Sequence, residues 1–241
     1  MSSNRIEITV NPAYRDATHF VESLPERFDA CGETIYKARN EIKLMRMGAM
    51  DVAVKSFKVP HLVNRFAYAF LRPSKAARSY FNALRLMREG VLTPTPVACV
   101  EEKRYGLLHR SYYVSAYVPV SGILRDLHYC TLEQVREPAE ALAHFTADIH
   151  SRRILHRDYS PGNVLYEKVD GEYRFYLLDI NRMSFDREID ERTAAFVLRK
   201  MWDKTEVALF IAGIYARDRG FDEGSFRERL LKHRLKFWHK P

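Results

Sequence analysis

The segment from His156 to Asn163, which reads His-Arg-Asp-Tyr-Ser-Pro-Gly-Asn, constrains the fold of this 241-residue chain more than any other feature. It contains the pattern H-R-D-x-x-x-x-N, and after a predicted β-hairpin an apolar run ends at Asp179. At average residue frequencies, such a four-residue match arises by chance in a chain of this length on the order of once in a thousand sequences. The match predicts a polar loop that brings Asp158, Asn163 and Asp179 to one site.

This spacing suits phosphoryl transfer from ATP. That reaction needs a carboxylate to position and deprotonate the attacking hydroxyl, and oxygen ligands to hold Mg²⁺ against the phosphates. Asp158 fits the role of the base, and Asn163 and Asp179 fit the role of metal ligands. Pro161-Gly162 supplies the turn between base and first ligand, and a hairpin turning at Asp170-Gly171 returns Asp179 to the same side. The pattern is that of the catalytic loop of kinases.

The strand and helix patterns predict an α+β fold with two lobes. A small β-rich N-lobe with one long helix covers residues 1–118, and a compact, mainly helical C-lobe covers residues 119–241. A loop-like stretch from Pro119 to Gly122 marks the boundary. The N-lobe sheet is expected to have five strands, at about 34–37, 42–47, 52–57, 97–101 and 111–118.

Helices are expected in both lobes. In the N-lobe, Ser74 can cap an amphipathic helix over about Lys75 to Glu89. In the C-lobe, Pro138 is expected in the first turn of a helix that ends near Arg153. Two or three further helices are expected after the hairpin.

The positive charge of the chain is concentrated in one stretch. There are 39 lysine and arginine residues against 31 aspartate and glutamate residues, which gives a formal net charge of +8. The segment from Ala53 to Arg88 contains no acidic residue and eight basic ones, which are Lys55, Lys58, Arg65, Arg72, Lys75, Arg78, Arg85 and Arg88. Such a local excess favours an anionic partner.

Composition and patterning exclude several other classes of protein. The longest nearly uninterrupted apolar stretch, Ala208 to Ala216, has nine residues, about half of the ~20 that a membrane-spanning helix needs. The first residues lack the basic and apolar regions of a secretory signal, so we expect a cytoplasmic protein. Cys31, Cys99 and Cys130 lie far apart without a C-x-x-C pair, which argues against a disulfide framework and a zinc knuckle.

Seven segments together resemble the bacterial lipopolysaccharide kinase family, the Kdo and heptose kinases of the inner core. The similarity extends from about Gly32 onward, and its segments are Arg39-Asn40, Val54–Pro60, Lys75–Tyr80, Thr93–Pro96, Ser111–Ser115, His156–Asn163 and Leu178–Arg182. The resemblance implies a two-lobed protein-kinase-like fold. It also implies ATP as the phosphate donor with Mg²⁺, and a sugar hydroxyl of the lipid A core, Kdo or heptose, as the acceptor.

The resemblance also implies roles for residues of the N-lobe. Lys55 would bind the α- and β-phosphates and so belong to the catalytic set with Asp158. The strand end from Ser115 to Val118, with Ala116 and Val118 as the contacts, would be the hinge whose backbone N–H and C=O groups hold adenine. No G-x-G-x-x-G precedes Lys55, so the side chains of Arg39 or Asn40 are expected to replace backbone contacts to the phosphates.

A second departure concerns the partner of Lys55. The predicted helix carries Phe81 where kinases place the glutamate that pairs with this lysine. Either Glu89, the only acid on that helix, or an acid from elsewhere such as Glu102 takes that role, or Lys55 is held less firmly.

The sequence allows more than one acceptor and more than one class of activity. Only 62 residues follow Asp179, since 241 − 179 = 62, and they contain no A-P-E motif. This favours an anionic sugar or glycolipid over a protein acceptor, and we favour it over nucleic acid as the partner of the basic stretch. The alternatives are an atypical protein kinase or aminoglycoside-type kinase, and a nucleotide-binding pseudokinase. The oligomeric state is not encoded in any motif.

The C-terminal segment is basic, with Phe237 and Trp238 interleaved. Its cations are Arg227, Arg229, Lys232, Arg234, Lys236 and Lys240. This composition fits two interpretations, a peripheral contact with the inner face of the cytoplasmic membrane or a solvated last helix.

Overall fold

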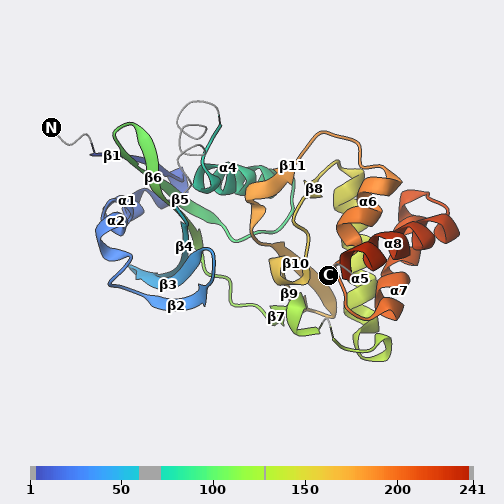
Figure 1. The fold of residues 1–241 in the computed structure, drawn as a ribbon. Helices are drawn as coiled ribbons and strands as arrows, with labels where there is room; N and C mark the ends of the chain where they lie inside the picture. Colours follow the sequence, from blue (N-terminus) through green and yellow to red (C-terminus); the bar gives the residue numbers. More distant parts are fainter. Residues whose placement is uncertain (1–3, 60–71, 128, 239–241) are drawn as a thin grey trace. The chain divides into compact units, whose positions relative to one another are not determined.

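The computed structural model describes residues 4–59, 72–127 and 129–238, and the chain divides into two compact units, 1–119 and 120–241 (Figure 1). The first unit is built on a β-sheet, and the second is mainly helical. The predicted α+β fold class is therefore confirmed. Three residues named above, Pro60, Arg65 and Lys240, lie outside the described residues.

The sheet of the first unit has six antiparallel strands in the order β1-β5-β6-β4-β3-β2. The strands are β1 (Asn4–Val10), β2 (Glu33–Lys37), β3 (Glu41–Met47), β4 (Met50–Phe57), β5 (Pro96–Arg104) and β6 (Leu107–Ala116). Strands β2, β3 and β4 form the predicted meander.

The prediction of five strands was wrong by one, because β1 was missed. Its sequence alternates Ile6, Ile8 and Val10 with polar residues, which is the period of a strand. Strand β1 pairs with β5. Ile8 of β1 lies opposite Val100 of β5, which is more than ninety residues further along the chain. Because the two strands are not joined by a hairpin, no turn residues mark the end of β1. The alternation of apolar and polar residues was therefore its only local signal.

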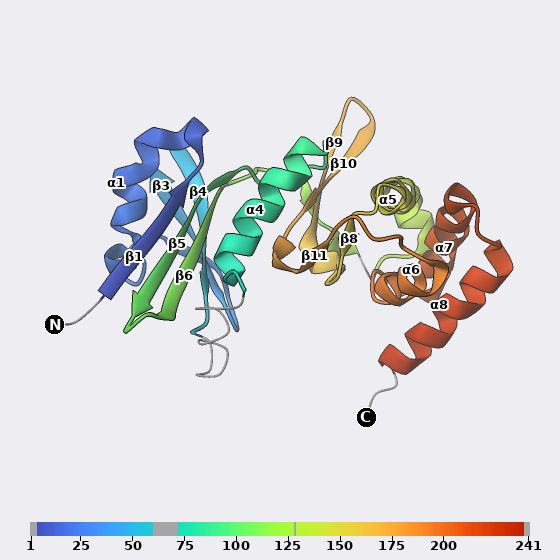
Figure 2. The same cartoon turned by 90° about the horizontal axis from the view of Figure 1, so that it is seen from above.

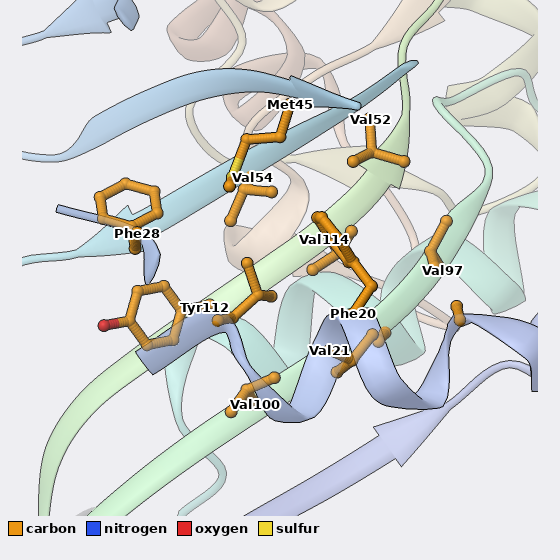
Figure 3. Close-up of a cluster of buried hydrophobic side chains, with 13 residues drawn as sticks. Phe20, Val21, Phe28, Met45, Val52, Val54, Val97, Val100, Tyr112 and Val114 are labelled. Carbon is orange, nitrogen blue, oxygen red and sulfur yellow. The ribbon is translucent and has the colours of Figure 1, made fainter. Parts of the chain in front are cut away.

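Helices cover both faces of this sheet (Figure 2). On one face lie the 3₁₀ helix η1 (Pro12–Ala17) and the short helices α1 (Thr18–Glu22) and α2 (Leu24–Arg27). Their side chains close a core of buried residues that includes Val21, Phe28, Val54 and Tyr112 (Figure 3). The ring centroids of Phe28 and Tyr112 are 5.3 Å apart.

The other face of the sheet carries α4 (Lys75–Arg88). As predicted, Ser74 caps it, because its hydroxyl accepts a hydrogen bond from the Ala77 backbone N–H at 3.1 Å. Ala76, Tyr80 and Ala83 are buried, whereas the Phe81 side chain is 54% exposed. The helix thus turns its small residues and Tyr80 towards strands β5 and β6, against which it packs.

The second unit combines short strands with four α-helices among the described residues. The strands are β7 (Gly122–Ile123), β8 (Leu155–His156), β9 (Val164–Val169), β10 (Glu172–Leu177) and β11 (Met183–Ser184). The helices are α5 (Leu132–Ser151), α6 (Glu191–Leu198), α7 (Thr205–Arg219) and α8 (Glu223–Trp238), and the 3₁₀ helices are η2 (Leu124–Leu127), η3 (Pro161–Asn163) and η4 (Ile180–Arg182). The hairpin β9–β10 turns at Asp170-Gly171, both with positive φ, as predicted.

Helix α5 begins earlier than the sequence suggested. It starts at Leu132, where Thr131 and Gln134 form a capping box, and Pro138 lies inside it rather than in its first turn. The backbone leaves helical geometry at Val135, three residues before the proline. Because proline has no N–H and clashes with the preceding turn, this kink lets the helix pass through Pro138.

Helix α5 also carries a buried histidine that makes the second unit sensitive to acid. His150 is 1% exposed, and its Nδ1 lies 2.9 Å from the Tyr215 hydroxyl of α7. Burial, with a smaller contribution from the charge of Arg219, lowers its pKa to about 3. An unfolded histidine has a pKa of about 6.5, so the unfolded chain binds a proton below that pH that the folded chain rejects.

We therefore expect the free energy of unfolding to fall by about 2 kcal/mol from this group between pH 7 and pH 5. Trp202 and Trp238 both belong to the second unit, so urea unfolding followed by tryptophan fluorescence measures it. The variant His150→Asn should lose this part of the pH dependence, and the exposed His19→Asn should keep it. Equal pH dependence in wild type and His150→Asn contradicts the prediction.

No helix among the described residues is long and apolar enough to cross a membrane.

Candidate active site

The loop from His156 to Asn163 is anchored at its start by a buried histidine. His156 ends β8, which pairs with β11, and it is 1% exposed. Its Nε2 lies 2.8 Å from the Leu178 carbonyl oxygen, and its Nδ1 accepts a hydrogen bond from the Asp158 backbone N–H at 3.1 Å. This pattern places the ring proton on Nε2, and burial lowers the pKa of His156. His156 therefore braces the loop as a neutral ring.

Two further contacts shape the loop. The buried Tyr159 hydroxyl lies 2.9 Å from the hydroxyl of Thr146 on α5. The Asn163 amide nitrogen donates to the Asp158 backbone carbonyl at 2.9 Å. Because the amide nitrogen makes this hydrogen bond, the amide oxygen is the atom of Asn163 that can serve as a metal ligand.

The carboxylate of Asp158 is bonded to a residue that the sequence analysis missed. The Lys200 ammonium donates to Asp158 Oδ1 at 2.7 Å. This hydrogen bond, with the charges of Lys200 and Arg182, lowers the pKa of Asp158. Lys200 follows α6 and lies 42 residues beyond Asp158, so no local motif connects the two in sequence.

Asp179 follows β10 in a left-handed conformation, with φ 51° and ψ 42°. Its Oδ1 accepts a hydrogen bond from the Asn181 side-chain amide at 2.6 Å. The Leu178 backbone N–H donates to the Asn163 carbonyl at 2.8 Å, which joins the two predicted ligands through neighbouring backbone. The structure therefore brings Asn163 and Asp179 to the same edge of the second unit.

The donors fit Mg²⁺ rather than a transition metal. Over the described ranges, no three His, Cys, Asp or Glu side chains gather in a way that could hold a metal ion. Mg²⁺ does not need such a cage, because it is usually bound by one or two carboxylates together with substrate phosphates and water. An amide oxygen from Asn163 and a carboxylate from Asp179 are hard ligands of that kind.

Glycine is needed at position 162 because of close packing and not because of a positive φ. The guanidinium of Arg125, on η2, lies directly against the Gly162 backbone, and a Cβ there would collide with it. The glycine thus admits an arginine beside the loop.

In the first unit, Lys55 lies on the face of the sheet that α4 covers. It is opposite Tyr113 of β6, which is opposite Cys99 of β5. Both residues interact electrostatically with Tyr80 of α4, so the row from Lys55 to Cys99 shares the α4 face. Lys55 is half-buried, and its Nζ lies 5.2 Å from the centroid of the Phe57 ring.

The structure assigns arginine partners to both acids suggested for Lys55. Glu89 accepts a hydrogen bond from Arg85, one turn earlier on α4, at 2.8 Å. Glu102 accepts one from Arg104 at 2.9 Å. Glu102 lies opposite Arg110, and strand alternation puts it on the sheet face away from Lys55, so its pairing with Lys55 was wrong.

The turn between β2 and β3 holds Arg39 and Asn40. Arg39 is exposed. The Asn40 side-chain oxygen accepts a hydrogen bond from the Lys58 backbone N–H at 3.3 Å, and its carbonyl accepts one from Ala38. Asn40 thus closes the turn against the end of β4, and Arg39 is the side chain that projects from it.

The predicted hinge begins where β6 ends. The Ala116 N–H donates to the Thr95 carbonyl at 2.9 Å, so this residue has only its carbonyl to offer a ligand. The Tyr117 N–H donates to the Asp51 carbonyl at 2.9 Å. Val118 follows beyond the strand, in the segment that leads to the second unit.

The chain has a protein-kinase-like fold and carries the H-R-D motif in the loop that follows β8. The solved structure described as "WaaP in complex with acyl carrier protein" matches over 97% of this chain and 100% of that chain, with a TM-score of 0.65 and 16% identity. A Mycobacterium tuberculosis PknI kinase domain, the C20A_R136N double mutant, matches over 83% of this chain and 94% of its own, with 16% identity and a TM-score of 0.41.

The family follows from the sequence itself. The profile of the lipopolysaccharide kinase (Kdo/WaaP) family matches residues 58–201, which is more than half of the chain. The chain therefore belongs to this family. No curated protein matches the sequence significantly. The matched range contains the H-R-D loop, Asp179 and Lys200, and it begins after Lys55.

Proposed function

We propose that this chain is an ATP- and Mg²⁺-dependent kinase that phosphorylates a sugar hydroxyl, on Kdo or heptose, of the lipopolysaccharide inner core. The observation that carries the proposal is the Asp158 carboxylate, held at the start of a braced loop whose far end presents Asn163 beside the backbone of Asp179. Family membership supports the class of reaction and the class of acceptor.

Asp158 acts as the base in this mechanism. The acceptor hydroxyl donates a hydrogen bond to the carboxylate, attacks the γ-phosphorus in line and gives its proton to Asp158. The new bond joins the sugar oxygen to phosphorus, the bond to the β,γ-bridging oxygen breaks, and ADP leaves. The lowered pKa of Asp158 keeps the carboxylate ionised and ready to accept the proton at neutral pH.

Asn163 and Asp179 would hold Mg²⁺. A Mg²⁺ ion held there would neutralise charge on the phosphate groups. Asn181 supports this role, because its hydrogen bond to Asp179 Oδ1 fixes the orientation of the carboxylate.

The first unit supplies nucleotide contacts in this proposal. Lys55 binds the α- and β-phosphates, and Arg39 adds a cation from the β2–β3 turn. The Ala116 carbonyl and the Val118 N–H hold the edge of adenine. Ala116 and Asn40 contribute less to nucleotide binding. The Ala116 N–H already donates to the Thr95 carbonyl, and the Asn40 side chain already accepts a hydrogen bond from Lys58.

The acceptor is an anionic glycolipid or sugar. Lys75, Arg78, Arg85 and Arg88 place four cations on α4, in the stretch that lacks any acidic residue. Inner-core sugars with carboxylate or phosphate groups match this charge better than a neutral acceptor does.

A peripheral contact with the cytoplasmic face of the inner membrane involves α8. Leu235 is 57% exposed and Trp238 47% exposed, beside the exposed cations Lys232 and Lys236. Arg234 does not belong to this basic surface, because it is 3% exposed. Cationic and aromatic side chains of this kind bind anionic lipid surfaces.

Transfer of labelled phosphate from ATP to purified lipid A core tests the proposal. We expect transfer that requires Mg²⁺, and acceptors that end at Kdo or extend to heptose will identify the sugar. Casein and an aminoglycoside serve as acceptors for the alternative kinase classes. Nucleotide binding without transfer to any acceptor indicates a pseudokinase and contradicts the proposal.

A further inference from the structure

We infer that Lys200 binds the phosphoryl group during its transfer, beside Asp158, and that Arg234 of α8 positions it. The inference rests on the proposed function, in which Asp158 is the base. It adds a catalytic residue from outside the H-R-D loop. It also explains why an arginine of the last helix is buried.

The ion pair leaves most of the lysine's hydrogen-bonding capacity unused. An ammonium has three N–H donors. Among the described residues, Asp158 Oδ1 is the one hydrogen-bond partner that the structure shows for Lys200. The Lys200 side chain is 19% exposed and that of Asp158 is 37% exposed, so the cation is largely shielded while the carboxylate faces the solvent side. Two of its donors are therefore available to a substrate group that binds beside the base.

The distance to Asp158 puts the charge where phosphoryl transfer needs it. An acceptor oxygen bonded to Asp158 lies about 2.7 Å from the carboxylate, and the phosphorus bonds to that same oxygen. The Lys200 nitrogen is itself 2.7 Å from the carboxylate. Cations fixed close to the oxygens of a transferring phosphoryl group stabilise the charge that develops on them.

The part of the loop between the base and Asn163 supplies no such cation. Tyr159, Ser160, Pro161 and Gly162, which separate the base from Asn163, are all uncharged. Arg125 lies against Gly162 and the charge of Arg182 acts on Asp158, but the cation that hydrogen-bonds the Asp158 carboxylate is Lys200, which follows α6.

Arg234 holds the backbone on both sides of Lys200. Its guanidinium donates to the carbonyls of Arg199 at 3.0 Å, Trp202 at 2.6 Å and Asp203 at 2.8 Å. Burial of a guanidinium is costly unless its donors are hydrogen-bonded, and these carbonyls accept from three of its five N–H groups. Since the bonds begin one residue before Lys200 and end three residues after it, the clamp fixes the direction from which the lysine reaches Asp158.

The test compares Lys200→Met and Lys200→Arg with Lys204→Met, which removes the same charge from an exposed position four residues along. Each variant is assayed for transfer to lipid A core, and for affinity to ADP and to a non-hydrolysable ATP analogue, both with Mg²⁺. For Lys200→Met we expect kcat to fall about 10²-fold, with analogue affinity reduced about tenfold and ADP affinity within about twofold of wild type. Lys200→Arg should recover part of kcat, and Lys204→Met should resemble wild type.

A lysine that only pairs with Asp158 gives a different result. Its removal changes the affinities for ADP and for the analogue equally or not at all, and that outcome overturns the inference while leaving the proposed function intact. A kcat of Lys200→Met equal to that of wild type would also overturn the inference and leave the proposed function intact. A wild-type chain that transfers no phosphate overturns the proposed function and this inference with it.

The role of Arg234 is tested by a double-mutant cycle. Arg234→Lys keeps the charge and loses the forked donors, and we expect kcat to fall about tenfold while ADP affinity stays within about twofold of wild type. In the Lys200→Met background the same change should have no further effect on kcat, because the residue that it positions is absent. Additive losses overturn the positioning role, and thermal unfolding of each variant shows whether it is folded.

Discussion

Replacing Asp158 with asparagine will lower the rate of phosphate transfer about 10³-fold and leave nucleotide affinity within about threefold of wild type. Asparagine keeps the shape of the side chain but cannot accept the proton of the acceptor hydroxyl. The backbone contacts of Asp158 with His156 and Asn163 do not involve the carboxylate, so the loop is expected to keep its conformation. Radiolabel transfer to lipid A core and calorimetric titration with ADP measure the two effects.

The fold should tolerate this change. The Asp158 side chain is 37% exposed and its only charged hydrogen-bond partner among the described residues is Lys200, and ion pairs at exposed positions contribute about 0–1 kcal/mol. The matched control is Asp170→Asn, which removes one carboxylate from an exposed turn of the same unit. Transfer by Asp158→Asn at more than a tenth of the wild-type rate would rule out Asp158 as the base.

The sequence was most informative where one short segment determines its own structure. The hairpin with Asp170-Gly171 at its turn and the Ser74 cap of α4 each depend on residues within a few positions of one another, and the H-R-D-x-x-x-x-N pattern lies within one short segment. Local backbone preferences and side-chain hydrogen bonds fix such features, so they could be read before any tertiary contact was known. The sequence spacing likewise predicted that Asn163 and Asp179 lie close together, and the Leu178 N–H donates to the Asn163 carbonyl next to Asp179, whereas their role as metal ligands stays a prediction.

The features that were missed depend on contacts between distant segments. Strand β1 pairs with β5, and Lys200 reaches Asp158 only because α6 ends near the loop. No motif distinguishes Lys200 from Lys204, since both lie in the connection between α6 and α7. The signal for β1 was present as alternating apolar residues, whereas Lys200 could be found only from the fold.

The N-lobe shows an intermediate case. The strand that carries Lys55 was predicted, but the acids proposed to pair with it could not be judged without strand register. Glu101 and Glu102 are neighbours in sequence and lie on opposite faces of β5. A shift of one residue in strand register therefore decides on which face of the sheet an acid lies. Register depends on the pairing of β5 with β1 and β6, which local sequence does not specify.

Replacing Asp179 with asparagine will remove the Mg²⁺-dependent part of nucleotide binding and lower phosphate transfer about 10²-fold or more. The carboxylate is the charged ligand of the proposed metal pair, and an amide oxygen cannot supply its negative charge. Asparagine is the suitable substitution because Asp179 has φ 51°, a left-handed conformation that asparagine adopts more readily than other side chains with a Cβ. The backbone and the hydrogen bond from Asn181 should therefore persist.

Thermal shift with ATP, measured with and without Mg²⁺, separates this effect from damage to the fold. Wild type should be stabilised further by ATP when Mg²⁺ is added, and Asp179→Asn should show the same shift under both conditions. Asp170→Asn is a matched control, because Asp170 is also an aspartate with positive φ, 52°, on the same hairpin. A Mg²⁺-dependent shift retained in full by Asp179→Asn would remove Asp179 from the metal site, and the positive φ would then be explained by the turn into η4 alone.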